Sequence, residues 1–119
     1  MSDMTTSSSA DQPAPIYEVA ALLKGEIEVG AEACVQGWVR TARHSKAGFS
    51  FVAVHDGSGF LPIQAVVNSD LGNYQSEVMR LGTGCAVRVT GTLVASQGKG
   101  QSVELQASQV EVVGWVEQP

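Results

Sequence analysis

The chain has 119 residues, a length that fits one domain and excludes a large enzyme. Its residues are 44% hydrophobic, enough for one modest core, and no apolar run approaches the roughly 18 residues of a membrane-spanning helix. The net charge of −5 disfavours a protein that binds nucleic acid by general electrostatic attraction. The N-terminus lacks the pattern of a signal peptide, so we expect a cytoplasmic protein with no membrane partner.

The first third of the chain contains a polar tail, a short helix and the first strand. Residues 1–15 are rich in Ser, Thr, Asp and Pro, and we expect a disordered tail ahead of a single domain, residues 16–119. Apolar residues at helical spacing predict a short amphipathic helix over 16–24. The first strand is predicted over 33–42.

Four more strands and a second helix are predicted in the rest of the chain. Strands over 49–55 and 60–67 are separated by an Asp-Gly turn signal. A helix is predicted over 74–81, with the preceding asparagine as its cap. The last two strands, 85–95 and 102–113, flank a Gly-rich stretch that is expected to be a hairpin loop.

This order of elements in a short chain predicts an all-β fold. Three strands, a short helix and two more strands, after a short N-terminal helix, match the five-stranded OB-fold barrel. In that fold the ligand lies across the second and third strands and two flanking loops. An SH3-like barrel is the alternative, but it does not need the helix between the third and fourth strands.

Alternation along each strand separates residues that face the barrel interior from those that face outward. The aliphatic sets, such as Val52 and Val54 in the second strand, are assigned to the interior. The outward set contains Phe51, Gln64, Arg88, Glu104 and Gln106. Alternation alone leaves the Phe51 set undecided, because it is as apolar as the Val52 set.

An outward Phe51 predicts a single-stranded nucleic-acid site. An exposed aromatic ring can stack on an unpaired base, and Gln64 carries a donor and an acceptor that can bond a base edge. Arg43 can bond a base or a phosphate, and Lys46, in a loop with a glycine, suits a phosphate. Glu104 accepts only, so it suits amino or imino donors on a base. The segment 37–64 carries three basic residues against one acidic residue, which favours a short, selective contact.

Other chemistry finds little support in the residues. Cys34 and Cys85 lie in apolar, strand-like runs and are expected to be buried, reduced thiols. No CxxC pair accompanies the two histidines, so we predict no metal site and no catalytic residue. Trp38 and Trp115 are expected to pack rather than to stack on bases.

Five segments resemble the N-terminal anticodon-binding domain of bacterial asparaginyl-tRNA synthetases. They are GWVRTARHSKAGFSFVAVHDGS, IQAVV, LGTGCAVRVTGTLVAS, VELQAS and VEVVGWVE, and they cover nearly all of residues 16–119. The resemblance implies that Phe51 stacks on the middle anticodon base, a uridine, and that Gln64 pairs with the same base. It also implies that Arg43 supports that contact and that Glu104 contacts the first anticodon base. The implied partner is the anticodon loop of a tRNA.

The chain departs from the family in two residues and in length. Ala42 and His44 stand where the family commonly has an arginine and an aspartate, and loss of the arginine removes one backbone contact. The family continues into a class II catalytic domain, which uses ATP and magnesium to activate asparagine. We therefore expect no cofactor in this chain and no catalysis from it alone.

Three functions remain open from the sequence. The first is anticodon recognition within an asparagine–tRNA ligase, with the catalytic domain as a partner in cis. The second is a general single-strand-binding OB module, and the third is a freestanding protein-interaction domain of the same fold. Exposed barrel edges also leave room for a weak homodimer.

Overall fold

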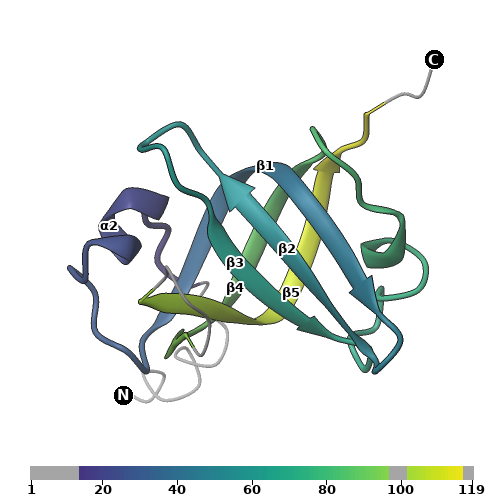
Figure 1. Ribbon diagram of the computed structural model, residues 1–119, viewed down its shortest axis with the longest axis horizontal. Coiled ribbons are helices and arrows are strands. Elements are labelled where there is room, and N and C mark those ends of the chain that lie inside the picture. The colour runs from purple at the N-terminus through teal and green to yellow at the C-terminus, as the bar shows by residue number, and fades with distance from the viewer. Residues whose placement is uncertain (1–13, 97–101, 117–119) are drawn as a thin grey trace, which may run out of the picture.

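The computed structural model describes residues 14–96 and 102–116, which form a closed five-stranded barrel (Figure 1). The strands lie in the order β1-β2-β3-β5-β4, and β1 also pairs with β4 to complete the ring. All pairs are antiparallel except β3 with β5. The elements are α2 (Val19–Leu23), β1 (Glu32–Ser45), β2 (Phe49–His55), β3 (Ile63–Asn68), the 3₁₀ helix η1 (Val78–Arg80), β4 (Ala86–Ala95) and β5 (Val103–Gly114). The predicted OB-fold barrel is confirmed.

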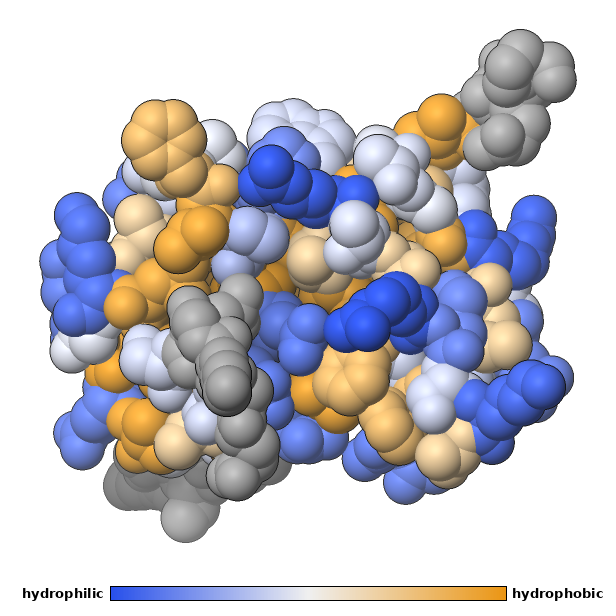
Figure 2. Space-filling view, in the orientation of Figure 1, coloured by the Kyte–Doolittle hydropathy of each residue, from blue (hydrophilic) through white to orange (hydrophobic). Residues whose placement is uncertain are grey.

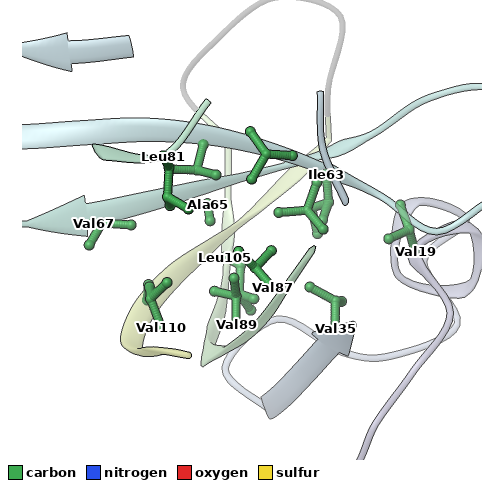
Figure 3. Close-up of a cluster of buried hydrophobic side chains, with 14 of the residues drawn as sticks. Val19, Val35, Ile63, Ala65, Val67, Leu81, Val87, Val89, Leu105 and Val110 are labelled. Carbon is green, nitrogen blue, oxygen red and sulfur yellow. The ribbon is translucent and has the colours of Figure 1, made fainter. Parts of the chain in front are cut away.

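The interior holds the aliphatic residues that strand alternation assigned to it (Figure 3). In β2, every second residue is buried, and Val52 and Val54 are among them. β3, β4 and β5 alternate in the same way over most of their lengths. Both cysteines, Cys34 and Cys85, are buried free thiols. The alternation leaves one continuous apolar core, with the other side of each strand available for contacts outside the barrel.

β1 is long and bends, and two glycines let the barrel close around it. Its first half, up to Trp38, pairs with β4, and its second half pairs with β2. A Cβ atom at Gly37 would overlap the carbonyl oxygen of His55, and one at Gly91 in β4 would overlap that of Gln106. Only a residue without a side chain fits where the two backbones approach this closely.

Helix α2 is shorter than the predicted 16–24 because the residues before it pair with β1. The backbone around Ile16 bonds that of Cys34 as an isolated bridge. The first helical N–H groups are then capped from a distant loop: Asp56 Oδ2 accepts from the Val19 N–H at 3.0 Å, and Ser58 Oγ accepts from the Ala20 N–H at 3.0 Å. The turn that follows β2 therefore also fixes the N-terminal helix on the barrel.

The predicted helix over 74–81 is wrong in type. The segment contains turns and the three-residue η1, and its backbone N–H groups bond carbonyls three, four or five residues earlier. Asn73 does not cap it; its side-chain amide donates to Glu77 and to the carbonyl of Val110 in β5. Tyr74, Val78 and Leu81 are all buried, so the segment packs against the core without regular α-helical geometry.

Some predictions fall outside the described residues. The tail lies outside except for residues 14 and 15, and so does the hairpin loop except for Ser96. Among the helices that the structure describes, none is long and apolar enough to cross a membrane.

The distant cap generates a prediction about acid stability. Burial of the Asp56 carboxyl raises its pKa, but hydrogen bonds from the Ser58 hydroxyl and from the backbone of Val19 and Ser58 outweigh this, and the pKa lies below its ordinary 3.8. The stabilisation is therefore complete above pH 3.8 and is lost as the pH falls through the lower, folded-state pKa.

We expect Asp56→Ala to lower the free energy of unfolding at pH 7 by about 0.5–2 kcal/mol, as for other lost helix caps. The difference from wild type should narrow at acid pH, where the wild-type carboxyl is protonated. Urea unfolding from neutral to acid pH measures this, with Asp70→Ala, at an exposed turn position, as the control. A gap that stays constant to the lowest pH would contradict the assignment.

Close backbone contact at Gly91 generates a second prediction. Gly91→Ala should lower the free energy of unfolding by roughly 1–3 kcal/mol, because β4 and β5 must separate to admit a methyl group. Gly82→Ala is the matched control, since a Cβ there meets no atom within 4 Å among the described residues. Equal losses in urea unfolding for the two variants would show that the close approach carries no cost.

Candidate nucleic-acid interface

The Phe51 ring lies outside the barrel, which resolves the ambiguity left by strand alternation. Phe51 is half-buried, and its neighbours Ser50 and Val52 point into the interior. Phe49, on the same side of β2, meets the Phe51 ring edge-on, with centroids 5.1 Å apart and planes at 89°. The pair forms a small aromatic platform on the outer face of β2.

Arg43 lies directly over this platform. Antiparallel pairing of β1 with β2 places Arg43 opposite Phe51, and the guanidinium carbon is 5.2 Å from the ring centroid. That distance is within the range of a cation–π contact. The arginine therefore covers the ring face on which a base would stack, and it brings the only positive charge that contacts the platform within the described part of the chain.

Gln64 and Glu104 form the polar side of the site. Gln64 is opposite Ala53 in the β2–β3 pair, and parallel pairing of β3 with β5 brings Glu104 beside it. Gln64 Nε2 donates to Glu104 Oε2 at 3.4 Å, and the Ser96 hydroxyl donates to the same oxygen at 3.4 Å. Both bonds are long, so they can be exchanged for bonds to a ligand at little cost.

Lys46 stands apart from the other four predicted residues. It is exposed in the turn 46–48 between β1 and β2. No hydrogen bond or ion pair in the described ranges joins it to Arg43, Phe51, Gln64 or Glu104. The turn itself is held in place, because the Ser69 N–H donates to the Gly48 carbonyl at 3.0 Å.

The outer face of β2, β3 and β5 is thus polar at its centre, with the aromatic platform beside it. Figure 2 shows strongly hydrophilic side chains over these strands, with hydrophobic ones at the left and right ends of the upper edge of the view. Stacking, a planar cation, an amide and a carboxylate within one small area can hold one or two unpaired bases.

A family model described as an OB-fold nucleic acid binding domain, tRNA_anti-codon, matches residues 33–113. The chain belongs to this family. The match covers all five strands except the first residue of β1 and the last of β5, and it includes all five predicted site residues.

The curated relatives are considerably longer than this chain. It is 62% identical over 104 residues to the asparagine--tRNA ligase of Klebsiella pneumoniae, a match that covers 87% of this chain and 22% of that ligase. The asparagine--tRNA ligase of Glaesserella parasuis is 61% identical over 101 residues, covering 85% of this chain and 22% of the relative. The chain thus spans less than a quarter of the length of these curated relatives.

Solved structures of low sequence identity share the fold. Entamoeba histolytica asparaginyl-tRNA synthetase in complex with asparaginyl-adenylate is 24% identical with a TM-score of 0.72, over 89% of this chain and 25% of that one. OBody AM3L09, bound to hen egg-white lysozyme, is 18% identical with a TM-score of 0.71, over 88% of this chain and all of its own. At this identity the likeness supports the barrel architecture and nothing more.

A network of hydrogen-bonded side chains behind the aromatic platform was not predicted from the sequence. Ser50 is fully buried, and its hydroxyl bonds His44 Nδ1 at 2.7 Å and the Tyr74 hydroxyl at 2.7 Å. The three residues tie the end of the β1–β2 hairpin to the segment before η1. A serine at an inward position of β2 was the available signal, because a buried hydroxyl needs a partner. Its partners are 6 and 24 residues away, and no spacing rule points to them.

Proposed function

We propose that this barrel is the anticodon-recognition domain of an asparagine–tRNA ligase and that it binds the tRNA anticodon loop on the outer face of β2, β3 and β5. The observation that carries the proposal is the convergence of Arg43, Phe51, Gln64 and Glu104 on one face of a barrel of the anticodon family. The relatives in Klebsiella pneumoniae and Glaesserella parasuis, both asparagine--tRNA ligases, indicate the amino acid.

Phe51 and Gln64 would recognise the middle base of the anticodon. Asparagine codons begin with two adenines, so the middle anticodon base is a uridine. Its edge presents an N–H donor between two carbonyl acceptors, and the Gln64 amide offers both complementary groups. Stacking on Phe51 holds the flat base in the plane where that amide can reach it.

Arg43 has to leave the ring when a base arrives. It occupies the exposed face of Phe51 at 5.2 Å, which is the place a stacked base would take. On leaving, its planar fork can bond a phosphate or a base edge beside the ring. The arginine thus shields an otherwise exposed aromatic surface in the free protein and supplies a charged contact in the complex.

Glu104 would recognise the first anticodon base. A carboxylate only accepts hydrogen bonds, so it favours guanine, whose pairing edge carries an imino and an amino donor, over uridine. In the free protein Glu104 accepts long hydrogen bonds from Gln64 and Ser96, which donors on a base could replace. Lys46, in the exposed turn after β1, would contact a phosphate of the same loop.

Aminoacylation itself would belong to the remainder of the ligase. The chain spans 22% of the matched relatives, and we infer that ATP, magnesium and asparagine are handled by a class II catalytic domain in the rest of such a polypeptide. The barrel would contribute selection of the correct tRNA.

Removing the stacking ring should weaken RNA binding. Phe51→Ala is expected to reduce the affinity for an asparagine anticodon stem-loop by about 1–3 kcal/mol, the usual contribution of one base–aromatic stack. Phe60→Ala, which removes an exposed phenylalanine outside the site, is the matched control and should bind as wild type. Fluorescence titration of the three proteins with one labelled stem-loop measures the difference. Equal affinity for Phe51→Ala and wild type would exclude the stacking role.

The role of Glu104 can be tested with stem-loops that differ in one base. The asparagine anticodon GUU differs from the lysine anticodon UUU only at the first base and from the aspartate anticodon GUC only at the third. We expect Glu104→Gln to reduce discrimination against the lysine loop by roughly 1–3 kcal/mol, as for other lost polar base contacts, while leaving discrimination against the aspartate loop unchanged. Equal, tight binding of the wild type to all three loops and to homopolymeric DNA would instead favour a general single-strand binder.

A further inference from the structure

Five large hydrophobic residues lie exposed along one edge of the barrel, away from the candidate RNA site. Phe60 is 95% exposed, Trp38 48% and Trp115 44%. Leu61 and Val116 are exposed as well. We call these five residues the aromatic edge. The two tryptophans were expected to pack rather than to stack on bases, and each also leaves almost half of its surface exposed.

The aromatic edge is one continuous surface. Arg40 links its two halves, because its guanidinium donates to the Phe60 carbonyl at 3.1 Å while its own carbonyl accepts from the Thr83 hydroxyl at 3.1 Å. Next to Thr83, the Val116 side chain lies close against Gly84. In Figure 1 the loop after β2 and the end of β5 lie at the top of the view on either side of β1, and Figure 2 shows hydrophobic groups at both ends of that edge with pale and hydrophilic groups between them.

The loop that carries Phe60 is held rigidly although its side chain makes little contact with the barrel. Asp56 Oδ1 accepts from the Ser58 N–H at 3.0 Å and from its hydroxyl at 2.6 Å, in addition to the cap on α2. The Arg40 bond then fixes the Phe60 backbone. A loop whose backbone is already held loses little backbone entropy when a partner covers its exposed aromatic residue.

The aromatic edge is separate from the RNA site. Trp38 pairs with His55 at the far end of β2, four residues from Phe51, a span of about 13 Å in an extended strand. The His55 and Trp38 rings contact each other with centroids 5.9 Å apart. A base stacked on Phe51 would therefore leave Phe60, Trp115 and Val116 uncovered.

We propose that the aromatic edge docks against the part of the ligase polypeptide that lies outside this barrel, an inference that rests on the proposed function. Tryptophan, phenylalanine and arginine side chains with aliphatic neighbours are the composition of a protein interface. The two arginines beside the aromatic edge already have partners: Arg40 bonds the Phe60 carbonyl, and the Arg80 guanidinium lies 5.0 Å from the Trp115 ring centroid. This arrangement suits an apolar partner surface better than a row of phosphates.

The length of the relatives and the path of β5 point to the same occupant. In the relatives the barrel is 22% of the polypeptide, so it has a much larger protein mass tethered to it. β5 ends at Gly114, and the next residues, Trp115 and Val116, form part of the aromatic edge. Polypeptide that continues past β5 in a longer chain starts on this surface and meets it at a high effective concentration.

The test compares the free chain with a chimera in which this chain replaces the matched segment of the Klebsiella pneumoniae ligase. The variant is Phe60→Ser with Leu61→Ser. Its matched control is Ile16→Ser with Val29→Ser, two other exposed aliphatic residues, which lie outside the aromatic edge. Thermal unfolding of both double variants as free chains checks that the barrel itself is unaffected.

In the chimera we expect the Phe60/Leu61 variant to be cleaved by trypsin between the barrel and the rest of the ligase roughly threefold faster or more, since cleavage tracks the open population. The Ile16/Val29 control should be cleaved at the wild-type rate. Equal rates for all three chimeras would overturn the proposal, and Leu61→Ser alone provides a milder second variant.

Two further measurements separate the other occupants. If the free chain sediments as a dimer that the Phe60/Leu61 variant dissociates, the occupant is a second copy and the proposal is wrong. If that variant lowers stem-loop affinity in the free chain, the edge binds RNA and the proposal is also wrong. Failure of the wild-type chain to bind any stem-loop would refute the proposed function, while the cleavage rates would still report on docking.

Discussion

Closure of the barrel through the parallel pairing of β3 with β5 is the constraint on which the site depends. The two strands are far apart in the chain and meet only in a short register, in which Ala65 is opposite Leu105 and Val66 opposite Gln106. This contact seals the core on the inside, where Ala65 and Leu105 are fully buried. On the outside it sets Gln64 beside Glu104, so one pairing both encloses the apolar interior and assembles the polar side of the site.

The interior could be predicted from the sequence because burial in a closed barrel follows a period of two. The predicted strand boundaries were less accurate where a strand continues through polar residues or where apolar residues lie in a loop beside the strand. β1 runs on through Arg43 to Ser45 because backbone pairing with β2 needs no apolar side chain. Phe60 and Leu61 were predicted in the third strand, but β3 begins at Ile63. Both residues are apolar but lie in an exposed loop, not in the core.

The site was predictable only as a set of outward residues. Alternation put Gln64 and Glu104 on the outer surface, and the family resemblance favoured an outward Phe51. The cation–π contact of Arg43 with Phe51 depends on the register of β1 and β2, which lies beyond strand alternation. The Ser50 hydroxyl bridge depends on a long-range contact with Tyr74. Contacts between strands and between distant side chains are therefore what the structure adds to the sequence.

The charge of the chain suggests why the proposed RNA recognition and the proposed docking would use different surfaces. With a net charge of −5, the chain as a whole would gain little from general attraction to phosphates, so the proposed RNA contact would have to rely on geometry around Phe51. Geometry is useful to a ligase only if the barrel is held in a fixed position relative to the place where the tRNA acceptor end reacts. The loop after β2 caps α2 through Asp56, is bonded by Arg40 and presents Phe60 outward. Such a loop is suited to that task. The same loop orders the barrel's own N-terminal helix, so the stability of the domain and the orientation of its RNA site would depend on one short turn.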